Sequence, residues 1–458
     1  MRSTASGAGE AARPAGACGI PSPPGRASRT TPSCGPLLGP AIERTDGDDM
    51  GSDTGIWILG GYQTDFARNF GREGKGVHDL VQEAVEGTLA DAGTRAADME
   101  VIHVGNAFGQ LFTGQGHLGA MPATVVPELW GVPASRHEAA CASGSIATLS
   151  AMADLEAGRY GCALVVGAEI EKTVPGDTAA AHLGAAAWVG HEGEDATFVW
   201  PWMFSALADE YDRRYGLDDA HLRAIAELNH RNAKANPLAQ ARGWTFDEKS
   251  FSDDDEHNPV VDGRTRRTDC SQVTDGGAGV VLATDGWVRE HPEVLRRGTA
   301  VRILGWGHRT VGLPLAAKTQ REDGPYVLSH VADTIRDAFD RAGVAEATDL
   351  DGIETHDCFS MSEYMAIDHF GITPPGDSWK AIEAGDLERD GRIPVNPSGG
   401  LIGGGHPVGA TGVRMLVDAS RQVTGRAGET QVEDASRFAT LNIGGSTATT
   451  CAFVVGRA

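Results

Sequence analysis

The chain has 458 residues, and its 63 acidic and 39 basic residues give a formal net charge of −24. This balance excludes a general nucleic-acid binder and a binder of anionic membranes, because both classes need a basic surface. Hydrophobic residues make up 41 % of the chain and charged residues 22 %, as in an ordinary globular protein. Since no run reaches the ~18 consecutive apolar residues of a membrane-spanning helix, we expect no membrane span.

Residues 1–49 differ in composition from the rest of the chain. They are rich in Pro, Gly, Ser and Ala and contain few large apolar side chains, so they cannot bury enough apolar surface to fold. They lack the apolar segment of a secretory signal, and the acidic residues between 43 and 49 argue against a transit peptide. We therefore expect a disordered leader, or a mis-called start with Met50 as the true first residue, which N-terminal sequencing of the native protein would decide.

Beyond Met50, strand patterns alternate with helix patterns. Such alternation predicts an α/β protein with largely buried strands. The first half, residues 50–172 plus 263–298, and the second half, residues 299–458, follow the same scheme, which suggests an internal repeat. In chain order, strands are expected at 55–60, at 101–105, ending at 138–141, and at 162–167, 279–283, 301–304, 351–355, 438–443 and 451–455. Helices are expected at 143–156, 331–342 and 408–422.

Residues 173–262 interrupt this alternation. They contain amphipathic helical patterns at 202–215 and 219–235, and loops rich in Gly, Asp and His, so we predict an inserted helical subdomain. Basic residues gather at its C-terminal flank, and they include Arg264, Arg266 and Arg267. This cluster is either solvated surface or a landing site for one polyanionic ligand on an otherwise acidic protein.

The seven cysteines are odd in number, widely spaced and without a CxxC pair. This pattern indicates neither a disulfide framework nor a zinc site, so we expect no bound metal. Free thiols are typical of a reducing compartment, and we expect a cytoplasmic protein whose thiols are available for chemistry.

Cys141 stands where a predicted strand passes into a predicted helix, in the sequence His137-Glu-Ala-Ala-Cys-Ala-Ser-Gly-Ser145. The positive end of a helix favours the thiolate, which is the nucleophilic form of the side chain. Small residues on both sides leave room for a substrate. Taken alone, a buried structural cysteine is the simpler interpretation.

His406 lies in the glycine-rich run Asn396-Pro-Ser-Gly-Gly-Leu-Ile-Gly-Gly-Gly-His-Pro-Val-Gly-Ala-Thr-Gly412. The glycines remove side chains from the approach to the imidazole. His406 can therefore serve as a general base for a thiol or as a donor to an oxyanion. Pro407 suits the first turn of the helix that we expect to follow.

A second thiol, Cys358, lies in the sequence His356-Asp-Cys-Phe359, directly after a predicted strand. Next to a nucleophilic thiol, a second thiol can act as acid and base toward a carbon acid. The tight turn Asn442-Ile-Gly-Gly445 adds backbone N–H groups that can hold an oxyanion.

Together these motifs resemble the thiolase superfamily, and within it the sterol-carrier-protein-type thiolases, over residues 55–455. The run 396–412 matches the family pattern NPSGGL…GHPxGATG. Residues 356–359 read HDCF, which separates the sterol-carrier type from thiolases with NEAF at that place. Residues 229–237 are similar to the loop domain of that type, and residues 270–276 resemble the segment beside the pantetheine arm of coenzyme A.

The resemblance implies a role for each matching residue. Cys141 would be the nucleophile that takes the acyl group as a thioester, and His406 would activate it and help to hold the thioester oxygen. Cys358 would move the proton at the substrate α-carbon or at the thiol of coenzyme A. His356 would belong to one oxyanion hole, and Gly444 with the backbone N–H of Cys141 would form the other.

The resemblance also places coenzyme A. Ser271 would touch the pantetheine arm. The candidates for the phosphates of coenzyme A, just before Ser271, are Arg264, Arg266 and Arg267. In conventional members the second cysteine begins a CxG motif, and that position is Asn442 here, so Cys358 has to be the acid–base thiol.

The fold that the resemblance implies is the thiolase fold, in which two similar βαβαβαββ halves form five layers in the order αβαβα, with an inserted helical loop domain. The implied activity is that of an acyltransferase in fatty acid or lipid metabolism, which cleaves 3-oxoacyl-CoA or condenses acetyl-CoA. Acyl-CoA and coenzyme A would be substrates, without a permanently bound cofactor, and the enzyme would be a homodimer or homotetramer.

Three other functions stay open. Some thiolase-fold proteins act as carbon–carbon lyases or as lipid-binding partners of a second chain. Such relatives tend to lose the nucleophilic cysteine, whereas this chain has Cys141, Cys358 and His406 together. A condensing enzyme of the ketoacyl-synthase kind would pair its cysteine with a second histidine motif, and the cysteine of HDCF is unsuited to its chemistry. A thiolase is therefore the leading hypothesis.

Overall fold

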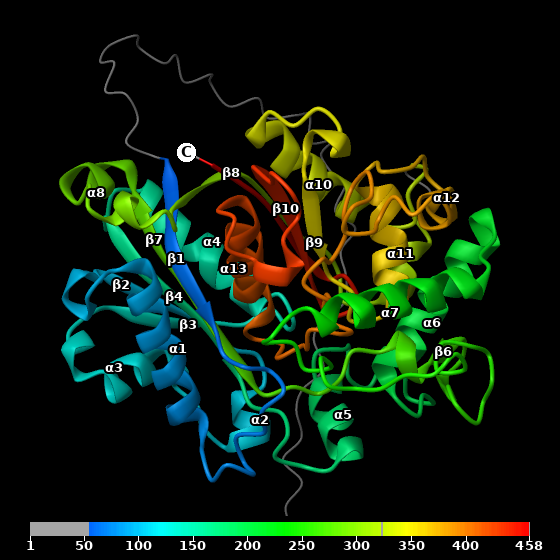
Figure 1. Cartoon of the computed structure of the whole chain (residues 1–458). Coiled ribbons are helices and arrows are strands. Elements are labelled where there is room, and N and C mark those ends of the chain that lie inside the picture. The colour runs from blue at the N-terminus through cyan, green and yellow to red at the C-terminus, as the bar shows by residue number, and fades with distance from the viewer. Residues whose placement is uncertain (1–54, 322–323, 458) are drawn as a thin grey trace, which may run out of the picture. The chain divides into compact units, whose positions relative to one another are not determined.

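The computed structural model describes residues 55–321 and 324–457, and the chain divides into the units Met1–Asp49 and Met50–Ala458. The predicted leader, 1–49, and the proposed start at Met50 lie outside the described residues. Alternating strands and helices build the second unit (Figure 1), as the sequence pattern predicts. No helix within the described ranges has both the length and the hydropathy that a membrane crossing requires.

Nine strands form one mixed sheet in the order β3-β2-β4-β7-β1-β8-β11-β10-β9. The strands are β1 (Ile56–Gln63), β2 (Val101–Gly105), β3 (Ala134–His137), β4 (Cys162–Glu169), β7 (Gly276–Thr284), β8 (Val301–Thr310), β9 (Gly352–Thr355), β10 (Arg437–Gly444) and β11 (Thr449–Gly456). Four of them, β2, β4, β7 and β9, are buried along their whole length, and β1, β10 and β11 are buried at all but one residue. These strands therefore read as continuous apolar runs in the sequence.

The two halves of this sheet repeat one topology. From β1 outward, β7 and then β4 pair antiparallel, followed by β2 and β3 in parallel. From β8 outward, β11 and β10 pair antiparallel and β9 follows in parallel. The counterpart of β3 is reduced to an isolated bridge between Ile353 and Val395. The halves meet where Ile56–Ile58 of β1 pairs antiparallel with Val301–Ile303 of β8.

Helices cover the outer faces of the sheet and fill the space between its halves. Helix α1 (Val77–Ala92) packs on β1 and β7, and α10 (Ser329–Ala342) packs on β8 and β11. Helices α4 (Ser143–Glu156) and α13 (Thr411–Val423) contact each other, and α13 contacts strands of both halves (Figure 1). The order of the layers, αβαβα, stays a prediction.

The segment between β4 and β7 carries three helices and a short hairpin. They are α5 (Gly176–Gly184), α6 (Val199–Tyr215), α7 (Asp219–Lys234), β5 (Val260–Asp262) and β6 (Thr265–Arg266). Helices α6 and α7 pack on α11 (Ser360–His369) of the second half. The hairpin crosses residue 262, where the sequence pattern ended the inserted subdomain, and the domain boundaries stay predictions. The other helices are α2 (Gly109–Thr113), α3 (Met121–Val125), α8 (Asp285–Glu290), α9 (Leu315–Thr319) and α12 (Ser378–Glu383).

Several predicted element ends were wrong, and two of them lie at the candidate site. Strand β3 ends at His137, so residues 138–141 form a turn and not the end of a strand. Helix α13 begins at Thr411, because the carbonyl of Pro407 accepts the N–H groups of Ala410 and Thr411 in a turn that precedes the helix. Pro407 is therefore outside the helix. Hydrogen bonds set these ends, and an apolar pattern does not show them.

Candidate active site

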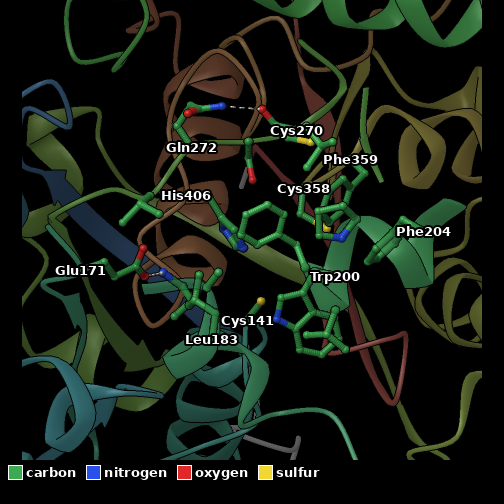
Figure 2. Close-up of a pocket in the computed structure, with 18 of the residues that line it drawn as sticks. Cys141, Glu171, Leu183, Trp200, Phe204, Cys270, Gln272, Cys358, Phe359 and His406 are labelled. Atoms are coloured by element: carbon green, nitrogen blue, oxygen red, sulfur yellow. Dashed lines mark hydrogen bonds between the residues drawn. The ribbon is translucent and has the colours of Figure 1, made fainter. Parts of the chain in front are cut away.

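Three segments that are far apart in the sequence line one cavity of about 370 Å³. Cys141 comes from the turn before α4, Cys358 from the segment between β9 and α11, and His406 from the loop before α13. Figure 2 shows these side chains directed at the same space. The structure therefore brings together the nucleophile, the acid–base thiol and the base that the sequence predicts.

The turn that carries Cys141 is tight. Ala140 has a φ of 50°, a left-handed conformation that costs a non-glycine residue about 1–2 kcal/mol. Ser143 holds the turn, because its Oγ accepts the N–H of Ala139 (2.9 Å) and donates to the carbonyl of Ala140 (2.6 Å). Strain of this kind is found where a reacting side chain has to be presented in one direction.

The loop that carries His406 closes over a buried carboxylate, Asp357. The oxygens of Asp357 accept the backbone N–H groups of Leu401 (2.6 Å) and Ile402 (3.1 Å). Gly400 has a φ of 60°, and a Cβ there would lie 2.3 Å from Oδ2 of Asp357. Only glycine allows this approach. The hydrogen bonds of Asp357 therefore hold the HDCF segment and the glycine-rich loop together.

Thr411 sets the protonation form of His406. Its Oγ1 lies 2.7 Å from Nδ1 of His406 and 3.0 Å from the carbonyl oxygen of Pro407. The hydroxyl has one proton and the carbonyl can only accept, so the hydroxyl accepts from the Nδ1–H of His406. The lone pair of the neutral ring is then on Nε2, which is buried and without a hydrogen-bond partner among the described residues. Such a nitrogen suits a general base.

Cys141, His356 and His406 form a compact cluster, in which the sulfur and one nitrogen of each ring lie within 4.8 Å of one another. The two rings meet edge to face, with centroids 5.1 Å apart. Burial lowers the pKa of His406 to about 3 and holds the pKa of His356 well below its usual value, so both imidazoles are neutral near pH ~7. One sulfur and two ring nitrogens at this spacing are close enough together to bind one soft divalent cation.

The predicted thiolate form of Cys141 was wrong for the resting site. Burial, and then the carboxyl group of Glu171, raise the pKa of the thiol to about 12. The backbone N–H groups of Gly445 and of Cys141 itself act in the opposite direction, but they do not outweigh the loss of solvent. Since the imidazole of His406 is also neutral, the resting site holds a neutral thiol beside a neutral base.

Alkylation of Cys141 should report this neutral pair. Because its pKa is raised, the thiolate fraction should increase tenfold per pH unit, and the rate with iodoacetamide should rise steadily between about pH 6 and 10. Peptide mass spectrometry of the alkylated residue measures the rate. A plateau through neutral pH would instead reveal a thiolate–imidazolium pair and would contradict the structure.

Cys358 lines the cavity from the other half of the chain and is 6 % exposed. Burial and the nearby Cys141 raise the pKa of its thiol well above the usual value, so it also rests as a neutral acid. Its Sγ lies 3.9 Å from Oγ of Ser362, and its carbonyl accepts the N–H of Ser271 (2.9 Å). Ser271 itself lines the cavity. It is therefore next to Cys358, the residue predicted to move the proton of the coenzyme A thiol.

The three candidate arginines for the coenzyme A phosphates have different positions. Arg264 pairs with Asp212 (2.8 Å) and Asp219 (2.7 Å), and Arg266 pairs with Asp255 (2.7 Å). Carboxylates therefore already satisfy these two guanidinium groups. Arg267 lines the cavity, and its Nη2 donates to the carbonyl of His257 (2.6 Å).

The end of β10 and the turn that follows it lie close to the turn of Cys141. A Cβ on Gly444 would lie 2.2 Å from the carbonyl oxygen of Ala139, so glycine is needed for the contact. The N–H group that faces the sulfur of Cys141 belongs to the next residue, Gly445, which also lines the cavity. Motif matching located this turn, but it could not show which N–H group points inward, and the predicted role of Gly444 stays a prediction.

Sequence reasoning missed Glu171, a buried acid that lines the cavity. Its oxygens accept the N–H groups of Val408 (3.0 Å) and Thr274 (3.2 Å), so it ties the segment after β4 to the loop of His406. Burial raises its pKa well above the usual value. The sequence did contain a signal, because two acidic residues, Glu169 and Glu171, follow the apolar run at 162–167.

Comparison with known proteins also divides the chain into an N-terminal and a C-terminal part. The family model described as thiolase, N-terminal domain, matches residues 56–244, and the one described as thiolase C-terminal domain-like matches residues 316–457. An acetyl-CoA acetyltransferase of Methanothermobacter thermautotrophicus is 32 % identical over 380 residues, which are 83 % of this chain and 94 % of that protein. Sterol carrier protein 2 of Bos taurus is 29 % identical over 403 residues, with 85 % of this chain and 70 % of that protein covered.

A solved structure described as Ltp2-ChsH2(DUF35) aldolase superposes with a TM-score of 0.70 at 18 % identity, over 88 % of this chain and 98 % of that one. At this identity the likeness shows the fold alone. The predicted α/β class and thiolase fold are thus confirmed. With both family models and the archaeal relative in agreement, the chain belongs to the thiolase family.

Proposed function

We propose that this protein transfers an acyl group between coenzyme A and Cys141, either by cleaving 3-oxoacyl-CoA or by condensing acetyl-CoA. One observation carries the proposal: two thiols and a neutral imidazole with an available Nε2 lone pair share one cavity. Thiolysis needs such a set, because it requires a sulfur nucleophile, a base for it and a second acid–base group at carbon. Membership of the family, with relatives described as acetyl-CoA acetyltransferases, supports an acyl-CoA thiolase in the broad sense.

In the first half-reaction, Nε2 of His406 takes the proton of Cys141, and the thiolate attacks the 3-oxo carbon of the substrate. The oxyanion that forms is held by N–H donors, for which the turn at Gly444 and Gly445 and the ring of His356 are the candidates. The bond between the 2- and 3-carbons then breaks. Its electron pair goes to the α-carbon of acetyl-CoA, which takes the thiol proton of Cys358.

In the second half-reaction, the thiolate left on Cys358 takes the thiol proton of coenzyme A. The coenzyme A thiolate attacks the acyl thioester on Cys141, and the cysteine sulfur leaves and regains its proton from His406. Both catalytic thiols and the imidazole return to the neutral forms of the resting site, so the cycle balances. The condensation uses the same steps in reverse order.

The walls of the cavity support an acyl-CoA ligand. Leu183, Trp200 and Phe204 of the inserted segment line it, and the ring of Phe204 stacks on Phe359 with centroids 4.6 Å apart. These apolar groups suit an acyl chain. We assign the coenzyme A side to Ser271 and Arg267, and we infer that Arg264 and Arg266 support this side through their carboxylate pairs.

We also infer a place in fatty acid or lipid metabolism in the cytoplasm, and a homodimer or homotetramer. The five described cysteines are all free thiols, which supports a reducing compartment. Strand β3 lies at an edge of the sheet with Ala134 and Ser135 exposed, and nearby Trp130 is 75 % exposed. Such an edge can pair with a second copy, and light scattering coupled to gel filtration would give the oligomeric state.

The assay that tests the proposal follows the loss of 3-oxoacyl-CoA across a series of acyl-chain lengths, with and without free coenzyme A. We expect cleavage that depends on free coenzyme A and yields two CoA esters. The alternative of a carbon–carbon lyase predicts cleavage of a 3-hydroxyacyl-CoA ester without free coenzyme A. That result, together with no thiolysis at any chain length, would overturn the proposal.

A further inference from the structure

The buried side chain of Asn442 stands between the nucleophile and the second histidine. Its Oδ1 accepts the hydroxyl proton of Ser145 (2.8 Å), and its Nδ2 lies 3.1 Å from the carbonyl oxygen of Cys141 and 3.1 Å from Nδ1 of His356. Asn442 and His356 are each 1 % exposed, so water does not compete for these contacts. The carboxamide is thus fully engaged in one orientation.

The donors and acceptors around the side-chain amide of Asn442 determine which way it points. A carbonyl oxygen can only accept, so the group that faces Cys141 has to be the amide nitrogen and not the amide oxygen. The same NH₂ group then offers its other hydrogen to Nδ1 of His356. An N–H donor at this distance requires a lone pair on the acceptor, so Nδ1 of His356 is unprotonated.

We propose that Asn442 is a positioning residue that fixes His356 as the Nε2–H tautomer, which makes this ring a hydrogen-bond donor in the active site. Thr411 fixes the opposite tautomer on His406, with a lone pair on Nε2. The two neutral histidines therefore have different functions: His406 receives a proton, and His356 donates a hydrogen bond without losing its proton.

The need for this division follows from the charges of the proposed reaction, on which the inference rests. Negative charge forms on the sulfur of Cys141 and then on the substrate oxygen, within a cluster where the sulfur and one nitrogen of each ring lie within 4.8 Å of one another. A lone pair of His356 directed at this charge would repel it, whereas an N–H group stabilises it. Since Nδ1 is already satisfied by Asn442, the Nε2–H remains as the donor.

The substitution Asn442→Asp tests the inference with little change in shape. A carboxylate beside Nδ1 accepts and does not donate, so His356 should shift to the Nδ1–H tautomer and turn an Nε2 lone pair toward the site. We expect kcat to fall by ~10²–10³, as for the loss of one oxyanion donor, with KM nearly unchanged. Because the new carboxylate raises the pKa of His356, the deficit should shrink as pH falls and the doubly protonated ring regains its Nε2–H.

The variant Asn442→Leu is the matched control, because it keeps the volume and removes all hydrogen bonding. His356 then loses its partner at Nδ1 and can still populate the Nε2–H form, so Leu should cost less activity than Asp at high pH. A purely structural role predicts the reverse order, since Asp is closer to Asn in shape and polarity, and a loss that does not depend on pH. Either result would overturn the inference.

Nitrogen-15 NMR of protein labelled at histidine reads the tautomer directly and needs no activity. The His356 signals, assigned by their absence in His356→Asn, should show a bare Nδ1 and a protonated Nε2 in the native protein, and the reverse in Asn442→Asp. A protonated Nδ1 in the native protein would contradict the assignment, even if the Asp variant fails to fold. Native thiolysis is measured separately, so a wrong proposed function and a wrong tautomer give different outcomes.

Discussion

Replacing Cys141 with serine is expected to reduce thiolysis by at least ~10⁴-fold, a loss comparable with the removal of a nucleophile from other covalent enzymes. The hydroxyl is a far weaker acid than the thiol, and the neutral imidazole of His406 beside it is a weak base. No thioester can form on oxygen. Stopped-assay rates and the intact mass of the protein after incubation with acyl-CoA measure both effects.

Cys162→Ala is the control for this variant. Cys162 is a fully buried thiol in the interior strand β4, outside the cavity lining, so its removal should leave the rate and the acyl adduct unchanged. An acyl adduct of native yield in Cys141→Ser, or turnover at the native rate, would show that another residue is the nucleophile.

Replacing Cys358 with alanine should separate the two chemistries of the site. The α-carbon of acetyl-CoA is a weak acid, so it needs a positioned base to remove its proton and a positioned acid to return one. A thiolate leaves without such help, so only the steps at the α-carbon should fail. We expect exchange of the α-protons of acetyl-CoA in D₂O to fall by ~10²–10⁴. Formation of the acetyl-enzyme on Cys141 from acetyl-CoA should stay within about tenfold of the native rate, since its leaving group is a thiolate.

Mass spectrometry follows both reactions, on acetyl-CoA for deuterium and on the intact protein for the acetyl group. Because Cys358 is buried, thermal unfolding of the variant should be recorded beside the rates. Unchanged deuterium exchange would remove Cys358 from the proposed role. An equal loss of both reactions in a folded variant would mean that the thiol shapes the site and does not transfer the proton at carbon.

The interiors of the elements were predictable from the sequence, but their ends were less so. The strand at 101–105 and the helix at 143–156 agree with β2 and α4 to the residue, because apolar periodicity reflects burial along an element. The turn at 138–141 and the helix start at Thr411 were not predicted. Both depend on contacts of single groups, such as the hydroxyl of Ser143 and the carbonyl of Pro407.

The residue types of the site were also predictable, whereas their states were not. Cys141, Cys358 and His406 stand in local motifs, and the structure places all three in one cavity. The position of Cys141 before a helix predicted a thiolate, but burial and Glu171 raise its pKa to about 12. Residues that are far apart in the sequence together exclude solvent from this thiol, so a local sequence pattern does not show its burial.

The sequence by itself determined the charge of −24, the α/β class, and the two thiols and the histidine whose motifs resemble those of the thiolase family. These properties depend on composition, periodicity and motifs, which are local. Only the tertiary structure decided the protonation of the site. Thr411 and Asn442 impose opposite tautomers on His406 and His356 through hydrogen bonds, and the bond from Asn442 joins residues that only folding brings together.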